Sequence, residues 1–356
     1  MNEKGVEKKM ENIELKNKAR GMLIGLAIGD ALGAPYEFGY KSEDIIKLGD
    51  KISHFKAQTK DFKLPKGAWT DDTSMALCIA DSILERGGYD SYDIMNKFVK
   101  WFLYGYRSSV DHSVGIGQQT SLCLLSYGRN KTIPIGAKKT TRAGNGPIMR
   151  LTPIVIAGTI PNSLDDIKRI SKMARLSCRE THDSYMAISV TEAFATALSL
   201  SFTHIDMIEH CTCWLTRSPK ELRDCETAIH DAINRAMKST NGDEFKDRGG
   251  YILDTFTIAV WGLLHSHSFK EGMLKVIRLG GDTGTNAACY GQLAGAYYGY
   301  QAIPEEWSRG VYLSDELIEI SDKLLNIDEC PIIRTRFEDD DHFVSYEDNN
   351  SLIRAV

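Results

Sequence analysis

The sequence predicts an all-α protein built as a single compact domain of many helices. Apolar residues recur at helical spacing over most of the chain, and polar, glycine-containing loops separate these runs. No run of residues shows the apolar–polar alternation of a strand, and no shift in composition marks a boundary between domains. We expect the domain to cover residues 17–327, with peripheral tails at 1–16 and 328–356.

Composition narrows the classes of function. The chain has 356 residues, of which 42% are hydrophobic and 26% are charged, as in a soluble globular protein. Its net charge of -5, without a basic cluster interleaved with aromatics, gives no reason to expect a nucleic-acid partner. The first residues lack the apolar region of a signal peptide, and the longest apolar run, 22–34, is too short to span a bilayer. We therefore expect a cytoplasmic monomer without a membrane partner, and its 8 scattered cysteines are expected to be core thiols.

The first predicted helix, residues 19–32, is rich in small side chains. Gly21, Gly25 and Gly29 recur every fourth residue, which gives one smooth face that allows another helix to approach closely. Asp30 lies at the end of this helix, and Glu37 follows in the next loop. Glu37 is either a solvated loop residue, the usual case for a lone glutamate, or part of a site.

The stretch 67–74, Gly-Ala-Trp-Thr-Asp-Asp-Thr-Ser, opens a second predicted helix at 73–85. Thr70, Asp71 or Asp72 can cap the free backbone N–H groups of the first helical turn, and acids there suit the helix dipole. Three adjacent oxygen donors are also what a magnesium-like cation requires. By itself the stretch favours capping. A second oxygen-rich stretch at 280–286, Gly-Gly-Asp-Thr-Gly-Thr-Asn, raises the weight of the metal interpretation.

Helical spacing continues along the rest of the chain. The loop 108–117, with Asp111 and His112, is predicted to be an ordinary capped loop. The loop 239–250 is polar, contains three glycines, and can cover a site. The further predicted helices are 92–104, about 116–127, 148–156, 163–175, 185–200, about 206–215, 219–237, 251–264, 271–279, 285–298 and 317–325.

Two more junctions between a loop and a helix carry polar groups. Residues 138–147 form a glycine-rich loop that leads into an apolar run, and Pro147 suits the first turn of a helix. Such a loop can present backbone N–H groups to a phosphate, although it matches neither the P-loop nor the Rossmann pattern. His182 precedes the predicted helix 185–200. If the junctions 67–74, 141–147, 178–184 and 280–286 converge, the site suits a substrate with a diphosphate and a sugar.

These motifs together resemble the ADP-ribosylglycohydrolase family, which includes the activating glycohydrolase of dinitrogenase reductase. The resemblance extends over about residues 17–310. Each motif alone is modestly specific, but their common order makes the resemblance strong. The matching segments are 25–33 with Glu37, 69–76, 144–150, 181–182, 250–255 with 259–261, 279–283 and 295–299.

The resemblance implies a metal-dependent hydrolase that cuts the ribose C1″ linkage of an ADP-ribosylated protein or a small ADP-ribose conjugate. It implies two Mg²⁺ or Mn²⁺ ions, held by Thr70, Asp71, Asp72, Asp282 and Thr285. Glu37, with Asp71 and Asp72, would be catalytic. The substrate would be held by Gly144, Asn145, Gly146 and His182, with Gly115 and Gly117 near the ribose.

The chain departs from the family pattern at two positions. Gly284 stands where the family carries an Asp expected to touch both metals, so we expect at least one of the two metal ions to bind more weakly, or neither to bind well. Gly115 stands where many relatives carry an Asp. Two alternatives therefore remain beside the enzyme: a catalytically impaired protein that binds ADP-ribose, and a purely structural helical protein. The intact glycine loop around Asn145 argues against the structural role.

Overall fold

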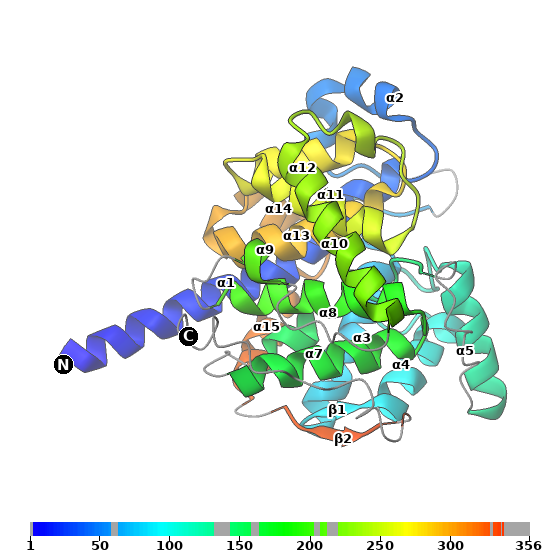
Figure 1. Cartoon of the computed structure of the whole chain (residues 1–356), viewed down its shortest axis with the longest axis vertical. Helices are drawn as coiled ribbons and strands as arrows, with labels where there is room; N and C mark the ends of the chain where they lie inside the picture. Colours follow the sequence, from blue (N-terminus) through cyan, green and yellow to red (C-terminus); the bar gives the residue numbers. More distant parts are fainter. Residues whose placement is uncertain are drawn as a thin grey trace.

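Two glycine-rich helices, α1 (Glu3–Gly33) and α13 (Thr283–Tyr298), form the centre of the fold (Figure 1). They run antiparallel with their backbones in contact, since Gly25 of α1 meets Gly291 of α13. A Cβ atom on either glycine would overlap the carbonyl oxygen of the other helix. The close packing predicted from the glycine spacing of the first helix is therefore confirmed. The helix that packs against it is the predicted helix 285–298, observed as α13.

The computed structural model describes residues 3–57, 63–131, 143–157, 164–202, 207–211, 220–327, 330–335 and 337. In these residues the predicted all-α fold is confirmed. The remaining α-helices are α2 (Ser42–Lys47), α3 (Asp71–Arg86), α4 (Ser91–Tyr104), α5 (Gln118–Asn130), α6 (Thr152–Ile156), α7 (Leu164–Arg179), α8 (Tyr185–Leu200), α9 (Met207–His210), α10 (Lys220–Lys238), α11 (Ile252–Leu264), α12 (Phe269–Arg278), α14 (Glu305–Gly310) and α15 (Ser314–Leu325). Short 3₁₀ turns are η1 (Ala34–Tyr36), η2 (Gly49–Ser53), η4 (Ile148–Arg150), η5 (Asp243–Phe245) and η6 (Tyr300–Ala302).

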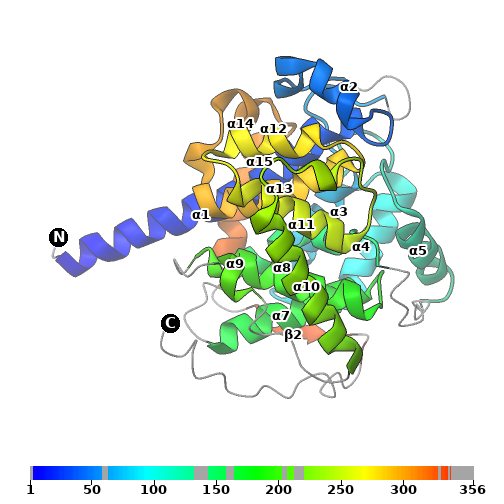
Figure 2. The same ribbon diagram turned by 45° about the horizontal axis from the view of Figure 1, so that its top comes forward.

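The other helices pack around the central pair. α11 and α12 lie against α13, and α10 lies across α8 and α11 (Figure 2). α3 contacts α1, α4 packs on α3, and α5 packs on α4. This arrangement brings the start of α3, the start of α13 and the end of α1 to one region of the molecule, because α1 and α13 are antiparallel.

Several elements differ from the prediction. α1 begins at Glu3 rather than after a frayed start, and its N-terminal part extends away from the other helices (Figures 1 and 2). The short helices α2 and α14 were too brief to produce a periodic signal. The predicted helix 206–215 lies partly outside the described residues. Its described part, 207–211, contains α9.

The described residues also contain one pair of short parallel strands, β1 (Tyr89–Asp90) and β2 (Ile332–Arg334). Strands of two and three residues are too short to show alternation, so the sequence did not predict them. Asp90 and Arg334 form an ion pair across them, with 2.7 Å between Oδ2 and Nη2. Seven of the cysteines are buried and free, as predicted, and Cys213 lies outside the described residues. Within the described residues, no helix is long and apolar enough to cross a membrane.

Candidate active site

The start of α3 is capped by a residue of another helix. Asp30, which is fully buried near the end of α1, accepts hydrogen bonds from the backbone N–H groups of Thr70 (2.9 Å) and Thr73 (3.1 Å) and from both of their hydroxyls (2.8 Å each). Thr70 occupies the cap position but makes no capping hydrogen bond to α3. Of the three candidate caps Thr70, Asp71 and Asp72, Thr70 therefore does not cap this helix through its side chain. Since Asp30 accepts hydrogen bonds from the backbone N–H groups at the start of α3, Asp71 and Asp72 are not needed as caps.

The second oxygen-rich stretch enters the same region at the start of α13. Gly280 and Gly281 both have positive φ angles, which a glycine adopts without strain, and the turn that they make orients Asp282. The backbone N–H of Asp282 donates to the carbonyl oxygen of Arg248 (2.9 Å), and its Oδ2 accepts from Nδ2 of Asn145 (2.8 Å). Thr285 follows on the first turn of α13 and is also buried.

Five carboxylates gather where α1, α3 and α13 meet, and we call Asp30, Glu37, Asp71, Asp72 and Asp282 the acid cluster. Burial raises the pKa of all five, and neighbouring carboxylates raise the pKa of Asp71, Asp72 and Glu37 further. For Asp71 the pKa rises to about 8. The repulsion between these buried carboxylates favours binding of a cation among them.

The donor set of the acid cluster fits a hard cation. Oδ1 of Asp72 and Oδ1 of Asp282 are buried without a hydrogen-bond partner, which is costly unless another group binds them. Carboxylate and hydroxyl oxygens are the ligands of Mg²⁺ and Mn²⁺. Among the described residues, however, no group of three His, Cys, Asp or Glu side chains is arranged to hold a metal by itself. Hydroxyls such as those of Thr70 and Thr285, or water, would have to complete the coordination.

Glu37 lies beside Gly284, the position at which the chain departs from the family pattern. A Cβ atom on Gly284 would lie only 2.5 Å from Oε2 of Glu37. The loop that carries Glu37 is held in place because the N–H of Phe38 donates to the carbonyl oxygen of Gly281 (3.0 Å). The carboxylate of Glu37 therefore uses the space that a side chain at 284 would take.

Gly115 and Gly117, the two glycines predicted to lie near the ribose, are in the loop before α5. Gly115 has a φ of 87°, and a Cβ atom there would collide with Oδ1 of Asp71. The backbone at Gly115 thus closes over Asp71, and a side chain at this position would be strained. Gly117 immediately precedes α5, and a Cβ atom there would meet no atom within 4 Å. Asp111 and His112 form an exposed pair in this loop, as expected for ordinary loop residues.

Asn145 joins the glycine loop to the acid cluster. Its backbone N–H donates to the carbonyl oxygen of Gly250 (3.0 Å), and its Nδ2 donates to Oδ2 of Asp282 (2.8 Å) and to Oγ1 of Thr255 (3.0 Å). A Cβ atom on Gly250 would lie 3.1 Å from Oδ2 of Asp282 and 3.4 Å from Oδ1 of Asn145, so a side chain there would press on Asp282. The motif 250–255 by itself indicates no role for Gly250 or Thr255, because their partners lie far away in the chain.

His182 closes the other side of the glycine loop. It is buried, and its Nδ1 lies 2.9 Å from Oγ1 of Thr181. A Cβ atom on Gly144 would lie 2.9 Å from its Nε2, and one on Gly146 would lie 3.1 Å from its Cε1. The two glycines thus let the loop backbone lie against the imidazole ring. Residues 138–142 of the predicted loop lie outside the described residues.

A cavity of about 600 Å³ opens beside the glycine loop. Its walls come from the first turns of α5, from the loop and from the segment before α11, and its lining residue Gly144 precedes Asn145 and lies against His182. It combines two glutamines at the start of α5 with one aromatic ring and one leucine. The lining residues are Gln118, Gln119, Leu122, Ala143, Gly144, Gly250 and Tyr251.

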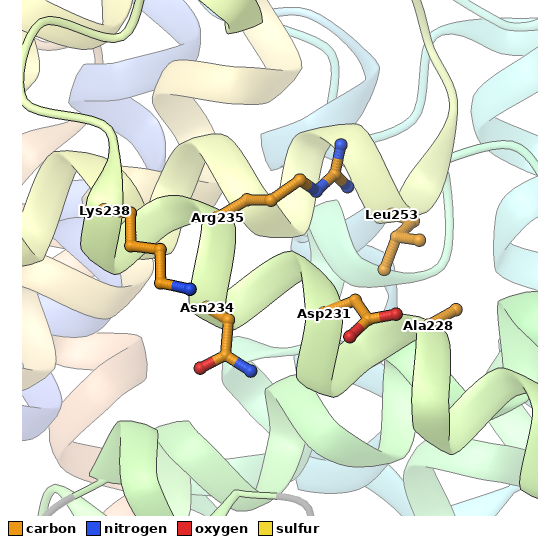
Figure 3. A pocket seen from close by; sticks show the side chains of 6 residues that line it. All are labelled: Ala228, Asp231, Asn234, Arg235, Lys238 and Leu253. Atoms are coloured by element: carbon orange, nitrogen blue, oxygen red, sulfur yellow. The ribbon is translucent and has the colours of Figure 1, made fainter.

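A second cavity, of about 570 Å³, lies along α10 and contains none of the predicted site residues (Figure 3). Figure 3 shows that the charged ends of Asp231, Arg235 and Lys238 point in different directions. Because these groups do not converge, this cavity is less suited to a specific ligand than the cavity beside the glycine loop.

Comparison with known proteins identifies the family of the chain. The family model described as ADP-ribosylglycohydrolase matches residues 11–331. The chain belongs to the ADP-ribosylglycohydrolase family. The ADP-ribosylarginine hydrolase Tri1 of Pseudomonas putida is 30% identical over 310 residues, covering 87% of this chain and 78% of the relative. The ADP-ribosyl-[dinitrogen reductase] glycohydrolase of Rhodospirillum rubrum is 27% identical, with 84% and 91% covered.

The family fold is also found among solved structures. A structure titled "ADP-ribosylglycohydrolase-related protein complex" is 33% identical to the chain and superposes with a TM-score of 0.65. The match covers 89% of this chain and 99% of that one. The all-α fold predicted from the sequence is therefore the fold of this family.

Proposed function

We propose that this protein hydrolyses the C1″ linkage between ADP-ribose and a protein side chain or a small conjugate, with the help of bound Mg²⁺ or Mn²⁺. The names of its relatives support hydrolysis of ADP-ribosyl groups. The observation that carries the proposal is the hydrogen bond from Asn145 to Asp282, because it joins the glycine loop to the acid cluster. A ligand with a diphosphate at one end and a reacting ribose at the other suits a site with these two parts.

In this proposal the glycine loop and the cavity beside it hold the part of ADP-ribose that does not react. Backbone N–H groups of the loop and of the first turn of α5 would bind the diphosphate. Tyr251 and Leu122 would provide an apolar surface for the base, since both line the cavity. Binding of these remote groups would place the ribose against the acid cluster, and this positioning lowers the barrier to reaction.

In the acid cluster, Thr70, Asp71, Asp72, Asp282 and Thr285 would hold the metal ions. A bound metal ion would orient the ribose hydroxyls and a water molecule. Glu37 would transfer the proton from the attacking water to the leaving group, because it lies in the acid cluster, and burial with the neighbouring carboxylates raises its pKa above the usual value. Cleavage at an anomeric carbon passes through an oxocarbenium-like state, in which negative carboxylates nearby are stabilising.

The proposal is tested by measuring release of free ADP-ribose from arginine-linked and serine-linked peptides, with magnesium or with a chelator. We expect magnesium-dependent release by the natural protein, and loss of release in Asp71→Asn. An Asp44→Asn variant, which changes an exposed aspartate of α2, is the matched control and should behave like the natural protein. Absence of release from either peptide by a protein that still binds magnesium and ADP-ribose would contradict the proposal.

Gly284 supports one alternative, a protein that binds ADP-ribose without cutting it. The position offers no carboxylate, so a metal ion would have one ligand fewer there. Calorimetry with ADP-ribose distinguishes the alternatives: binding without release would indicate a binding protein, whereas neither binding nor release would indicate a structural protein. The carboxylate of Glu37 next to Gly284 favours the enzyme, because an oxygen already lies in that space.

A further inference from the structure

Arg150 is a completely buried arginine behind the glycine loop. Its Nη2 donates to Oγ1 of Thr181 (2.7 Å) and to the carbonyl oxygen of Ser177 (3.2 Å). Its guanidinium carbon lies 4.7 Å from the centre of the Phe98 ring. Burial lowers the pKa of Arg150 to about 10, so it remains charged at neutral pH. Burying a charge is costly, and a residue kept at that cost calls for an explanation.

The contact with Arg150 limits the directions in which the hydroxyl of Thr181 can point. A guanidinium can only donate, so Oγ1 of Thr181 must accept from Arg150 and cannot direct its proton there. That proton is then available to its other close partner, Nδ1 of His182, at 2.9 Å. If Nδ1 accepts this proton, the ring's own proton must be on Nε2, because a neutral imidazole carries one proton.

The Nε2 edge of His182 faces the loop that would hold the ligand. Gly144 and Gly146 lack side chains where Cβ atoms would lie 2.9 Å from Nε2 and 3.1 Å from Cε1. Among the described residues, Nε2 has no hydrogen-bond acceptor of its own. Burial, aided by the charge of Arg150, also lowers the pKa of His182 to about 3, so the ring stays neutral.

We propose that Arg150 and Thr181 are positioning residues that hold His182 in the Nε2–H tautomer, so that His182 donates a hydrogen bond to an oxygen of ADP-ribose at the glycine loop. His182 then takes no part in proton transfer, in contrast to Glu37. The identity of the ligand rests on the proposed function, whereas the tautomer rests on the hydrogen bonds alone. The oxygen that accepts is a phosphate or a ribose oxygen, since the ring can only donate to it.

The tautomer can be measured by ¹⁵N NMR of the full chain labelled at histidine. The chain has 9 histidines, and the signal of His182 is assigned by its loss in His182→Gln. We expect the natural protein to show a protonated Nε2 and an unprotonated Nδ1. Thr181→Val keeps the shape but removes the hydroxyl, so both tautomers should appear. Thr181→Ser restores the hydroxyl and should restore the single tautomer.

The same variants are tested for ADP-ribose affinity by calorimetry. We expect Thr181→Val to weaken binding about 10-fold, as for loss of one hydrogen bond, and Thr181→Ser to bind like the natural protein. The matched control is Thr196→Val, which removes a buried threonine hydroxyl from α8 that bonds only to its own helix. This control should change neither the tautomer nor the affinity.

A protonated Nδ1 of His182 in the natural protein would overturn the proposal, and this measurement needs no folded Thr181 variant. An unchanged tautomer and affinity in a folded Thr181→Val would also overturn it. If the natural protein shows the Nε2–H tautomer but does not bind ADP-ribose, the tautomer assignment holds, while the donor role and the proposed function both fail. The two failures are therefore distinguishable.

Discussion

The acid cluster and the glycine loop meet at Asn145 but differ in how their polar groups are satisfied. In the acid cluster, Asp72 and Asp282 each keep a buried oxygen without a hydrogen bond, and like charges lie close together. Around the loop, Asn145 and Thr181 use their side chains in hydrogen bonds to neighbouring residues. The acid cluster is thus unfavourable without a cation, whereas Asn145 and Thr181 already have hydrogen-bond partners.

Asp30 shows that charge alone does not decide which carboxylates stabilise the fold. It belongs to the acid cluster by position, but both of its oxygens accept hydrogen bonds from α3. We therefore expect removal of the two kinds of carboxylate to change the stability of the protein in opposite directions. Loss of a satisfied carboxylate should destabilise the protein, and loss of an unsatisfied one should stabilise it when metal is absent.

The largest effect on stability is expected for Asp30→Ala. It leaves two backbone N–H groups and two hydroxyls at the start of α3 without their acceptor, which should cost about 3–5 kcal/mol of unfolding free energy. Urea denaturation measures this loss. A loss below about 1 kcal/mol would show that other groups or water replace Asp30 as the cap.

The largest effect on activity is expected for Asp72→Asn. Removing one proposed metal ligand should reduce release of ADP-ribose by about 10²–10³-fold. In a chelator the same variant should be about 1 kcal/mol more stable than the natural protein, because it removes one member of a cluster of like charges. A variant that loses both activity and stability would contradict the contrast between the two regions.

The pH dependence of stability tests the acid cluster without any substitution. The pKa of Asp71 is raised to about 8, so its contribution to stability is full below the unfolded value of about 4 and is lost as the pH rises through about 8. With a chelator, the melting temperature should therefore fall as the pH rises from 5 to 8.5. Saturating magnesium should remove most of this fall. An equal fall with and without magnesium would exclude a metal ion in this cluster.

Asn145→Ala should change stability in the opposite direction to Asp72→Asn. It removes the donor that Asp282 and Thr255 share, so unfolding free energy should fall by about 1–3 kcal/mol, even in a chelator. Activity should also fall, because the loop and the acid cluster lose their connection. Thermal unfolding and ADP-ribose release measure the two effects, and an increase in stability would contradict the assignment.

The smallest effect is expected at Gly284. Ala has a higher helix propensity than Gly, and a substitution in α13 would ordinarily add up to about 1 kcal/mol of stability. Because the new Cβ atom would press on Oε2 of Glu37, we expect Gly284→Ala to lower activity about 10-fold, and to add little to the loss in Glu37→Gln. Additive losses would show that Glu37 does not depend on the space at 284.

Much of the fold could be predicted from local patterns. Helical spacing located most of the long helices, and the glycines of the first helix correctly indicated a close helix contact. The missed elements were short, such as α2 and the strand pair, because brief segments carry too little periodicity. Around the candidate site, the structure brings the motif residues Thr70, Asp71, Asp72 and Asp282 together, and their role as metal ligands stays a prediction.

The sequence by itself determined which helices form and which oxygen-rich junctions stand at their starts, because helix propensity, spacing and capping act over a few residues. Only the tertiary structure decided how those groups are used. Asp30 caps a helix that begins 41 residues later, and Asn145 donates to an aspartate 137 residues away. Such partners depend on how antiparallel helices bring distant segments together, and no local pattern contains that information.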